Sequence, residues 1–373
     1  MAAYGSANTP ANPTAGNITG GSSYGDLSKN DAFTIQKRML PIAKRLLTFA
    51  KFAQKETKPQ KQGLEIRHRR YERFPIVDTP IAEGVTPDFT TIDQTTLKHT
   101  LKQYGSYVNT TDVMMAASAD PIVQTVTERQ AQQAGETLDY LAYKVFRAGT
   151  QVKHGGNDAD SSGGAAATTR DGVDGTCNAV SPALGAPGAG DSRNFDTAIR
   201  KLEQQDCKKM RNMLRASTGI GTQPIREAYI AVCHPDLRQD LEANPDFIAA
   251  SKYSDTSDLI EGEIGEIKGI RFITTTQAVP FKNAGVVDAD AVTTGTAGTD
   301  KADVYPIIIM GQDFGGCATL GGMDSLRSKI HAPSVGPGDP LGQRGTIAWD
   351  TWYSCIILQD LWMYRIECLA TRV

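Results

Sequence analysis

The chain has 373 residues, a formal net charge of -3 at pH 7, 40% hydrophobic residues and 22% charged residues. This balance is typical of a globular protein with one large domain or two to three modest ones. It argues against a protein that binds nucleic acid over its whole surface, and no apolar run reaches the 18 residues expected of a membrane-spanning helix. The N-terminus, MAAYGSANTPANPTAG, lacks the charged-then-apolar layout of a signal peptide.

The N-terminal segment divides into a polar arm and a basic stretch. Residues 1–30 contain few large apolar side chains, so alone they bury too little surface to offset the entropy of ordering them. Residues 31–55 carry an apolar stripe opposite Lys and Arg side chains, which predicts an amphipathic helix. From Asp31 to Pro75 there are twelve Lys or Arg and four acidic residues, a balance of about +8. Three interpretations stay open: a solvated face, a membrane-surface helix, or contact with an acidic neighbour or packaged nucleic acid.

The next segment, from Leu64 to about Lys98, predicts two strands of an extended hairpin. Strand-forming residues on both sides flank the Pro- and Gly-rich stretch TPIAEGVTPD. An isolated two-stranded hairpin is marginally stable in water, so this one is either an edge hairpin of its own domain or lies on another subunit. The candidates for contact between subunits are the basic residues Arg67, Arg69, Arg70 and Arg73 of the hairpin, with Lys44 and Arg45 of the preceding helix.

Asp120 and Pro121 begin the clearest helix of the chain, since Asp caps helix N-termini well and Pro suits the first turn. The apolar spacing predicts a helix over 121–148, ended by Gly149, and a second helix over 194–215. Residues 154–190 are low in complexity and predict a surface loop, whereas 191–335 alternate strands and short helices. The C-terminal residues 336–373 contain all three tryptophans and predict strands buried in a sheet beside the long helix.

The sequence contains no recognisable catalytic or metal-binding motif. Phosphate-loop, nucleophile-elbow and HExxH patterns are absent, and Cys233 and His234 point to opposite faces of a predicted strand. Six widely spaced cysteines without a CxxC pair predict reduced thiols rather than a disulfide framework. We therefore expect no catalytic residue, no cofactor and no metal site. The five histidines occur singly, at His68, His99, His154, His234 and His331.

Six stretches, in this order, resemble the major capsid proteins of the N-four-like phage family. They are EGVTPDFTTID, LKQYGSYVNTTDV, DPIVQTVTERQAQQAGETLDYLAYKVFRAGT, HPDLRQDLEANPDF, IEGEIGEIKGIRFI and DPLGQRGTIAWDTWY. The most specific positions are Gly262, Glu263, Gly265, Gly269 and Arg271 of the first glycine-rich motif, and Asp339, Pro340, Leu341, Gly342, Gln343 and Arg344 of the second.

The resemblance implies an α+β, Hong Kong 97-type phage capsid fold. In its terms, residues 1–60 are the N-terminal arm and 61–100 the extended E-loop hairpin. Residues 101–190 are the peripheral domain, with a spine helix over 121–148 and a long β-sheet. The axial α/β domain occupies 191–335, and 336–373 return to the peripheral domain.

The resemblance also implies a structural role and no enzymatic activity. A major capsid protein of this kind self-assembles as hexamers and pentamers into an icosahedral shell around the double-stranded DNA of a tailed phage. Its expected partners are itself, decoration, scaffolding and portal proteins, and packaged DNA bound non-specifically, but no membrane. It is expected in the virion shell, made in the host cytoplasm. We expect removal of residues 1–55 to abolish shells but leave folded subunits.

Other interpretations stay open at this point. An encapsulin-like protein compartment has the same fold, and a cargo-peptide pocket is not recognisable here. An α/β enzyme would need a binding pocket with perturbed titratable groups, which we do not find in the sequence. A nucleic-acid-binding module is supported only by the basic segment from Asp31 to Pro75.

Overall fold

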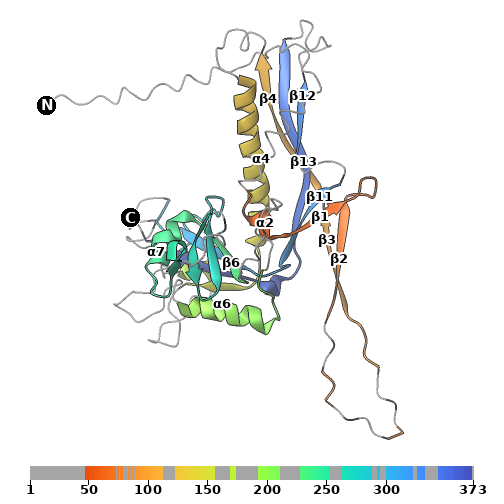
Figure 1. Cartoon of the computed structure of the whole chain (residues 1–373), viewed down its shortest axis with the longest axis vertical. Coiled ribbons are helices and arrows are strands. Elements are labelled where there is room, and N and C mark those ends of the chain that lie inside the picture. The colour runs from red at the N-terminus through yellow and green to blue at the C-terminus, as the bar shows by residue number, and fades with distance from the viewer. Residues whose placement is uncertain are drawn as a thin grey trace, which may run out of the picture. The chain divides into compact units, whose positions relative to one another are not determined.

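A computed structural model provides the structure of the protein. The residues that it describes are 47–72, 74, 76–78, 80, 83–84, 86, 89–111, 122–155, 169–173, 192–210, 227–252, 260, 262–287, 292–294, 300–321, 326–331 and 343–371. They belong to two compact units (Figure 1). The first unit contains Gln103–Tyr140, Thr319–Tyr353 and the chain up to Ala50, and the second contains Lys51–Lys102, Leu141–Ala318 and Ser354–Val373.

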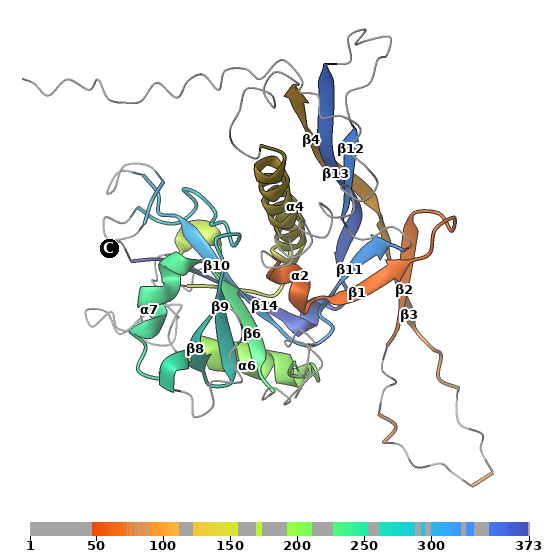
Figure 2. The same ribbon diagram turned by 45° about the horizontal axis from the view of Figure 1, so that its top comes forward.

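The first unit combines one long helix with β-strands. Helix α4 covers Ile122–Phe146, within the range predicted for the spine helix, and its residues up to Tyr140 belong to this unit. Strand β13 (Arg344–Ile357) pairs with β12 (Arg327–His331) and with β4 (Lys102–Thr111). In both views α4 lies alongside these strands (Figures 1 and 2).

Helix α4 presents small residues and polar hydrogen-bonding residues to β13. Ala131 and Ala134 are fully buried, which lets the helix backbone approach closely. The Gln130 amide donates a 2.6 Å hydrogen bond to the Ile347 carbonyl, and the indole of Trp349 donates to Gln133 Oε1 at 3.2 Å. These bonds fix the position of the helix along the strand, since each buried polar group has to find a partner.

Gly105 is required where β4 meets β13. A Cβ at this position would lie 2.6 Å from the carbonyl oxygen of Trp349. The strands therefore come closer here than any other residue allows.

Asp139 anchors the start of the short helix α2 (Phe49–Phe52) to α4. Its Oδ1 accepts hydrogen bonds from the backbone N–H groups of Thr48, Phe49 and Ala50, at 2.9, 2.7 and 3.3 Å. Its Oδ2 is buried and has no hydrogen-bond partner among the described residues. The carboxyl thus supplies the acceptor that the first N–H groups of a helix require.

The prediction of a basic helix over 31–55 is wrong at its C-terminal end. Helix α2 stops at Phe52, and strand β1 occupies Gln54–Lys58; residues before 47 lie outside the described part of the chain. Phe49 and Phe52 are 0% and 1% exposed, so the end of the predicted apolar stripe is buried in the core. A truncation of residues 1–55 would remove both from the core, which argues against the expectation that it leaves folded subunits.

The second unit is built on a seven-stranded sheet. Strands β6 and β9, and likewise β14 and β5, are parallel, and the other four pairings of the sheet are antiparallel. In spatial order the strands are β5 (Val152–His154), β14 (Met363–Leu369), β10 (Val304–Met310), β6 (Tyr229–Cys233), β9 (Ile270–Thr274), β8 (Glu263–Ile267) and β7 (Ile248–Ala249).

Helix α6 (Ser192–Gln204) covers one face of this sheet (Figure 2). Its Phe195 meets Phe272 of β9 edge-on, with ring centroids 5.2 Å apart. Helix α7 (Arg238–Glu242) adds buried Leu241 to the same core. The three central strands β14, β10 and β6 are buried at every position, as expected for strands covered on both faces.

The helix predicted over 194–215 is shorter than expected. It ends at Gln204, and Asp206 adopts φ 54°, a left-handed conformation that terminates helices. Met210 then forms a β-bridge with Ala228. Residues 211–226 lie outside the described part of the chain.

The last strand differs from its predicted place. We expected 336–373 to return as a whole to the sheet beside the spine helix. Strand β13 does so, but the turn at Asp360–Trp362 separates it from β14, which pairs with β10 and β5 in the seven-stranded sheet. The apolar pattern identified a two-sided buried strand but not which of two sheets contains it.

Two further pieces complete the second unit. Strand β1 pairs with β11 (Gly315–Leu320), which pairs with the end of β13. Strands β2 (Glu65–Tyr71) and β3 (Gln94–Thr100) form the predicted antiparallel hairpin, from Glu65↔Thr100 to Tyr71↔Gln94.

The carboxyl of Asp139 generates a pH-dependent prediction. Burial raises its pKa from 3.8 to about 6, against the opposing effect of the three N–H donors. Because the folded-state pKa lies above the unfolded value, the stabilisation is complete below pH 3.8 and is lost as the pH rises through about 6. Between pH 5 and 8 we expect the free energy of unfolding of the wild type to fall by about 1–2 kcal/mol relative to that of Asp139→Asn. The Asn side chain keeps the acceptor oxygen but does not titrate.

Urea unfolding of both proteins across this pH range measures the difference. The buried NH2 of the Asn variant adds only a constant offset. Free energies of unfolding that change in parallel with pH would contradict the raised pKa.

Candidate assembly surface and its supporting contacts

In Figure 1 the chain between β2 and β3 continues beyond their paired residues. The described residues of this connection include large apolar side chains that are exposed. Ile76, Phe89 and Val77 are 93%, 88% and 78% exposed. Several large apolar side chains exposed in one connection are unfavourable in water, as is expected of a surface that another molecule covers. We call these side chains the hairpin apolar set: Tyr71, Phe74, Ile76, Val77, Phe89 and Ile92.

The arginines predicted as contact residues lie on both faces of β2. Arg67 and Arg69 are exposed on one face, where Arg67 is opposite Lys98 on β3, and Arg70 points to the half-buried face. Arg67 forms a 2.9 Å ion pair with Glu65, and Arg70 forms one of 2.8 Å with Glu72.

Glutamate partners offset the positive charge of Arg67 and Arg70. The hydrogen bonds from Arg67 and Arg70 lower the pKa of Glu65 and of Glu72. Arg69 has no ion pair with any residue in the described ranges. Arg73, Lys44 and Arg45 lie outside them. The described arginines therefore form a locally balanced surface, and the hairpin apolar set is the larger feature, which the sequence analysis did not single out.

Two histidines meet at the base of the hairpin. His68 and His99 are diagonal neighbours on β2 and β3, and their Nε2 atoms lie 3.2 Å apart. His68 Nδ1 is 3.3 Å from Glu56 Oε1, and His99 Nδ1 is 3.0 Å from the hydroxyl oxygen of Ser354. The chain Ser354–His99–His68–Glu56 links the hairpin to β1 and to the end of β13.

The two rings were predicted to be isolated, which is wrong. Their positions, 31 residues apart, become neighbours only through the antiparallel register. Glu56, His68 and His99 bring one ligand atom each to within 4.8 Å of one another, although a hydrogen bond between the two Nε2 atoms satisfies the rings without an ion. Burial, then His68 and Lys58, lowers the pKa of His99 to about 4.

The lowered pKa predicts that acid loosens the hairpin. A histidine with a depressed folded-state pKa stabilises the fold above its ordinary pKa of about 6.5, and that contribution is lost as the pH falls towards 4. We expect amide protection in β2 and β3 to drop between pH 7 and pH 5 in the wild type. The drop should be smaller in His99→Gln, which does not titrate.

Hydrogen exchange by mass spectrometry, corrected for the intrinsic pH dependence of exchange, measures this protection. His331→Gln is the matched control, since His331 is an exposed histidine on another strand, β12. An equal loss of protection in all three proteins would contradict the assignment to His99.

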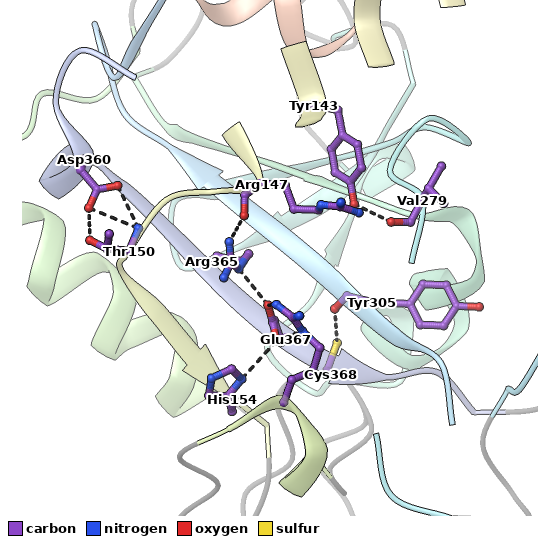
Figure 3. A network of polar contacts seen from close by, with 11 residues as sticks. Tyr143, Arg147, Thr150, His154, Val279, Tyr305, Asp360, Arg365, Glu367 and Cys368 are labelled. Atoms are coloured by element: carbon purple, nitrogen blue, oxygen red, sulfur yellow. Dashed lines mark hydrogen bonds and ion pairs between the residues drawn. The ribbon is translucent and has the colours of Figure 1, made fainter. Parts of the chain in front are cut away.

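A buried carboxylate holds the second unit together (Figure 3). The Glu367 side chain on β14 is fully buried. Arg170 forms a bidentate pair with it at 2.9 and 2.8 Å, and Arg365 Nε lies 2.9 Å from Glu367 Oε1. His154 Nδ1 is 3.1 Å from Glu367 Oε2. Two guanidinium groups thus compensate one fully buried carboxylate, and the Arg170 side chain itself is 33% exposed.

The same network reaches the end of helix α4. Arg365 donates a hydrogen bond to the carbonyl of Arg147, just after the last helical residue, Phe146. A cation at this point also favours the negative end of the helix dipole. The guanidinium groups of Arg147 and Arg170 lie over the ring of Phe281, 4.5 and 3.4 Å from its centroid. Such cation–π contacts keep both arginines in place.

Removal of the buried charge should destabilise the protein strongly. Glu367→Gln leaves Arg170 and Arg365 without their carboxylate, and loss of one partner of a buried ion pair costs about 3–5 kcal/mol. Glu203→Gln is the matched control, because Glu203 is about half exposed and pairs with Lys209 at 3.6 Å. We expect a change below about 1 kcal/mol there. Urea unfolding measures both values, and equal effects would contradict the role of Glu367.

The first glycine-rich motif builds the β-hairpin of β8 and β9. Gly262 and Gly269 adopt φ +83° and +89°, and Gly269 follows Lys268, with φ 50°, in the turn between β8 and β9. A Cβ on Gly265 would lie 2.3 Å from the Phe247 ring. Glu263 and Arg271 form a buried 3.1 Å ion pair across the two strands.

The second motif falls mostly outside the described residues. Asp339, Pro340, Leu341 and Gly342 are not described, Gln343 directly precedes β13, and exposed Arg344 begins that strand.

Within the described part of the chain, no helix combines the length and hydrophobicity needed to cross a bilayer.

The comparisons with known proteins agree with this architecture. A family model described as phage capsid protein matches residues 94–366. No curated protein matches the chain.

Solved capsid structures resemble the chain at low sequence identity. The capsid of cyanophage P-SCSP1u is 14% identical, with a TM-score of 0.54 over 87% of this chain and 89% of that one. The capsid of Ralstonia phage GP4 is 12% identical, with a TM-score of 0.54 over 86% and 88%. The head of Helicobacter pylori bacteriophage KHP40 is 11% identical, with a TM-score of 0.55 over 87% and 90%.

A long helix beside a long β-sheet, an α/β unit and an extended hairpin together define a Hong Kong 97-type shell protein. The chain belongs to the phage capsid protein family. It is a major capsid protein of the virion shell, hence a structural protein and not an enzyme. The α+β Hong Kong 97-type fold predicted from the sequence is confirmed.

Proposed function

We propose that the protein assembles as hexamers and pentamers into an icosahedral shell that encloses the double-stranded DNA of a tailed phage. The observation that carries this proposal is the hairpin apolar set. Ile76, Val77 and Phe89 are at least 78% exposed on a two-stranded hairpin, which by itself is marginally stable in water. A neighbouring copy that covers them supplies the missing burial.

The energetics suit a closed shell. Each fully buried side chain of this size contributes about 1.5–3 kcal/mol, so a few of them give a moderate pairwise contact. Each subunit repeats such contacts with several neighbours, and the sum over a closed assembly exceeds any single interface. A shell can therefore form from subunits that still dissociate and correct their positions during growth.

Electrostatics support a container for DNA rather than a sequence reader. The net charge of -3 gives no uniformly basic surface. Exposed Arg69 and Lys98 on the hairpin offer local positive charge beyond the Arg67–Glu65 ion pair, enough for non-specific contact with phosphates. We further propose the predicted hairpin and arm residues Arg73, Lys44 and Arg45 as contacts between subunits, and scaffolding, decoration and portal proteins as additional partners.

An encapsulin-like compartment is the second candidate within the same fold. The family match over residues 94–366 favours the phage protein. An assembled particle that carries a cargo enzyme and no DNA would favour the compartment.

A single substitution in the hairpin tests the assembly proposal. Ile76 is 93% exposed, so Ile76→Asp should change the stability of the isolated subunit by less than about 0.5 kcal/mol. In a shell, the new carboxylate would be buried at every copy of the contact. We expect the yield of closed particles to fall by more than about tenfold, because the penalty recurs throughout the shell.

Sedimentation and electron microscopy of the recombinant chain, assembled alone or with phage lysate components, measure particle yield. Circular dichroism checks that the variant is folded. The matched control is Ile76→Leu, which keeps the apolar surface and should assemble normally. Shells formed by Ile76→Asp at the wild-type yield would show that this part of the hairpin is not a contact.

A further inference from the structure

Two cysteines face each other across neighbouring strands of the second unit. The Sγ atoms of Cys317, on β11, and Cys355, near the end of β13, lie 2.9 Å apart. Just beyond the ends of the two strands, the Phe314 carbonyl accepts hydrogen bonds from the N–H groups of Leu358 and Gln359, at 3.0 and 3.1 Å. Cys317 lies three residues after Phe314, and Cys355 lies three residues before Leu358. In an antiparallel register that pairs Phe314 with Leu358, Cys317 and Cys355 are therefore directly opposed.

This register places the cysteines within bonding reach. Directly opposed pairs alternate between hydrogen-bonded and non-hydrogen-bonded types, and the pair three positions from Phe314 and Leu358 is of the second type. Its Cα atoms are about 4.5 Å apart, inside the range of about 4.4–6.8 Å found for disulfides. Side-chain rotation is therefore enough to join the sulfurs, and no strand has to move.

Cys317 and Cys355 flank a segment of the chain that belongs to the first unit. Both cysteines belong to the second unit, and the chain between them contains Thr319–Tyr353, which belongs to the first. Cys317 lies two residues before the chain leaves the second unit, and Cys355 lies just after it returns. A bond here closes the loop that contains β12 and most of β13.

The other described cysteines have different surroundings. Cys207, Cys233 and Cys368 are buried, and each thiol lies 3.7–3.8 Å from a backbone carbonyl that accepts its hydrogen bond. Cys355, in contrast, is partly exposed, which admits a small oxidant.

We propose that Cys317 and Cys355 form an intrachain disulfide when the protein leaves the reducing cytoplasm for an oxidising medium. The oxidant is a low-molecular-weight disulfide such as glutathione disulfide. The pairing does not depend on shell assembly, but its timing, after virions are released, rests on the proposed function. The reduced thiols predicted from the sequence remain the expected state in a reducing cytoplasm.

The reaction is an ordinary thiol–disulfide exchange. The Cys355 thiolate attacks one sulfur of glutathione disulfide, which breaks its S–S bond and releases one glutathione thiolate. Cys317 loses its proton to solvent and attacks the Cys355 sulfur of the mixed disulfide. This forms the Cys317–Cys355 bond and expels the second glutathione. The two protein thiols are oxidised by two electrons, and one glutathione disulfide is reduced to two thiols.

The test uses the full-length recombinant chain, incubated folded with glutathione disulfide, then alkylated and digested without reduction. We expect a linked peptide pair that contains Cys317 and Cys355, and alkylation of the other cysteines. The midpoint of thermal unfolding should rise on the order of 5–10 °C, because the bond closes a long loop. Dithiothreitol should reverse the shift.

Matched variants separate the pair from general oxidation. Cys317→Ser should retain glutathione on Cys355, because the second thiol is missing, whereas Cys207→Ser should form the linked peptides as the wild type does. Complete alkylation of Cys317 and Cys355 in the folded, oxidised wild type would overturn the proposal, as would linkage of either cysteine to a different one. Neither result would bear on shell assembly, which the Ile76 variants test separately.

Discussion

The second unit depends on a carboxylate that has no contact with water. Glu367 lies on β14, a strand that is buried at every position and sits next to β10 in the seven-stranded sheet. A buried charge is tolerated only where paired charges and hydrogen bonds replace its hydration. Arg170 and Arg365 provide that replacement, and each is itself held by Phe281 or by the carbonyl of Arg147.

This requirement joins segments that are distant in sequence. The end of α4, strand β5, the turn at Arg170–Gly172 and the C-terminal strand all contribute to one set of contacts (Figure 3). These ion pairs and hydrogen bonds hold the segments together within the second unit. A rigid unit of this kind suits a protein whose copies have to repeat the same contacts many times.

The hairpin of β2 and β3, in contrast to this buried network, leaves large apolar side chains uncovered. Its paired strands are anchored through His68 and His99, whereas Ile76 and Phe89 lie almost fully in solvent. Such a surface is unfavourable for a monomer, yet it is what a second copy can cover. The contrast between a satisfied core and an unsatisfied hairpin is the physical basis of the assembly proposal.

Local patterns in the sequence were enough to predict the elements with strong signals. The apolar period of α4, the hairpin of β2 and β3, and the two-sided apolar character of the C-terminal strands are each determined by neighbouring residues. Asp120 and Pro121, the predicted start of the helix, lie outside the described residues. The ends of the basic helix and of α6 were misplaced. A left-handed residue such as Asp206 and the change to strand at Gln54 are decided by packing around them.

Contacts between distant segments were beyond the sequence alone. These contacts depend on strand register and on the path of the chain between strands. They include the place of β14 in its sheet, the contact of His68 with His99, the opposition of Cys317 and Cys355, and the pairing of Glu367 with Arg170. Register is specified by how both faces of a sheet are covered, and that is a property of the whole fold. By itself, the sequence determined the type of most elements and the family resemblance. Only the tertiary structure decided which side chains meet, because long-range packing selects the partners.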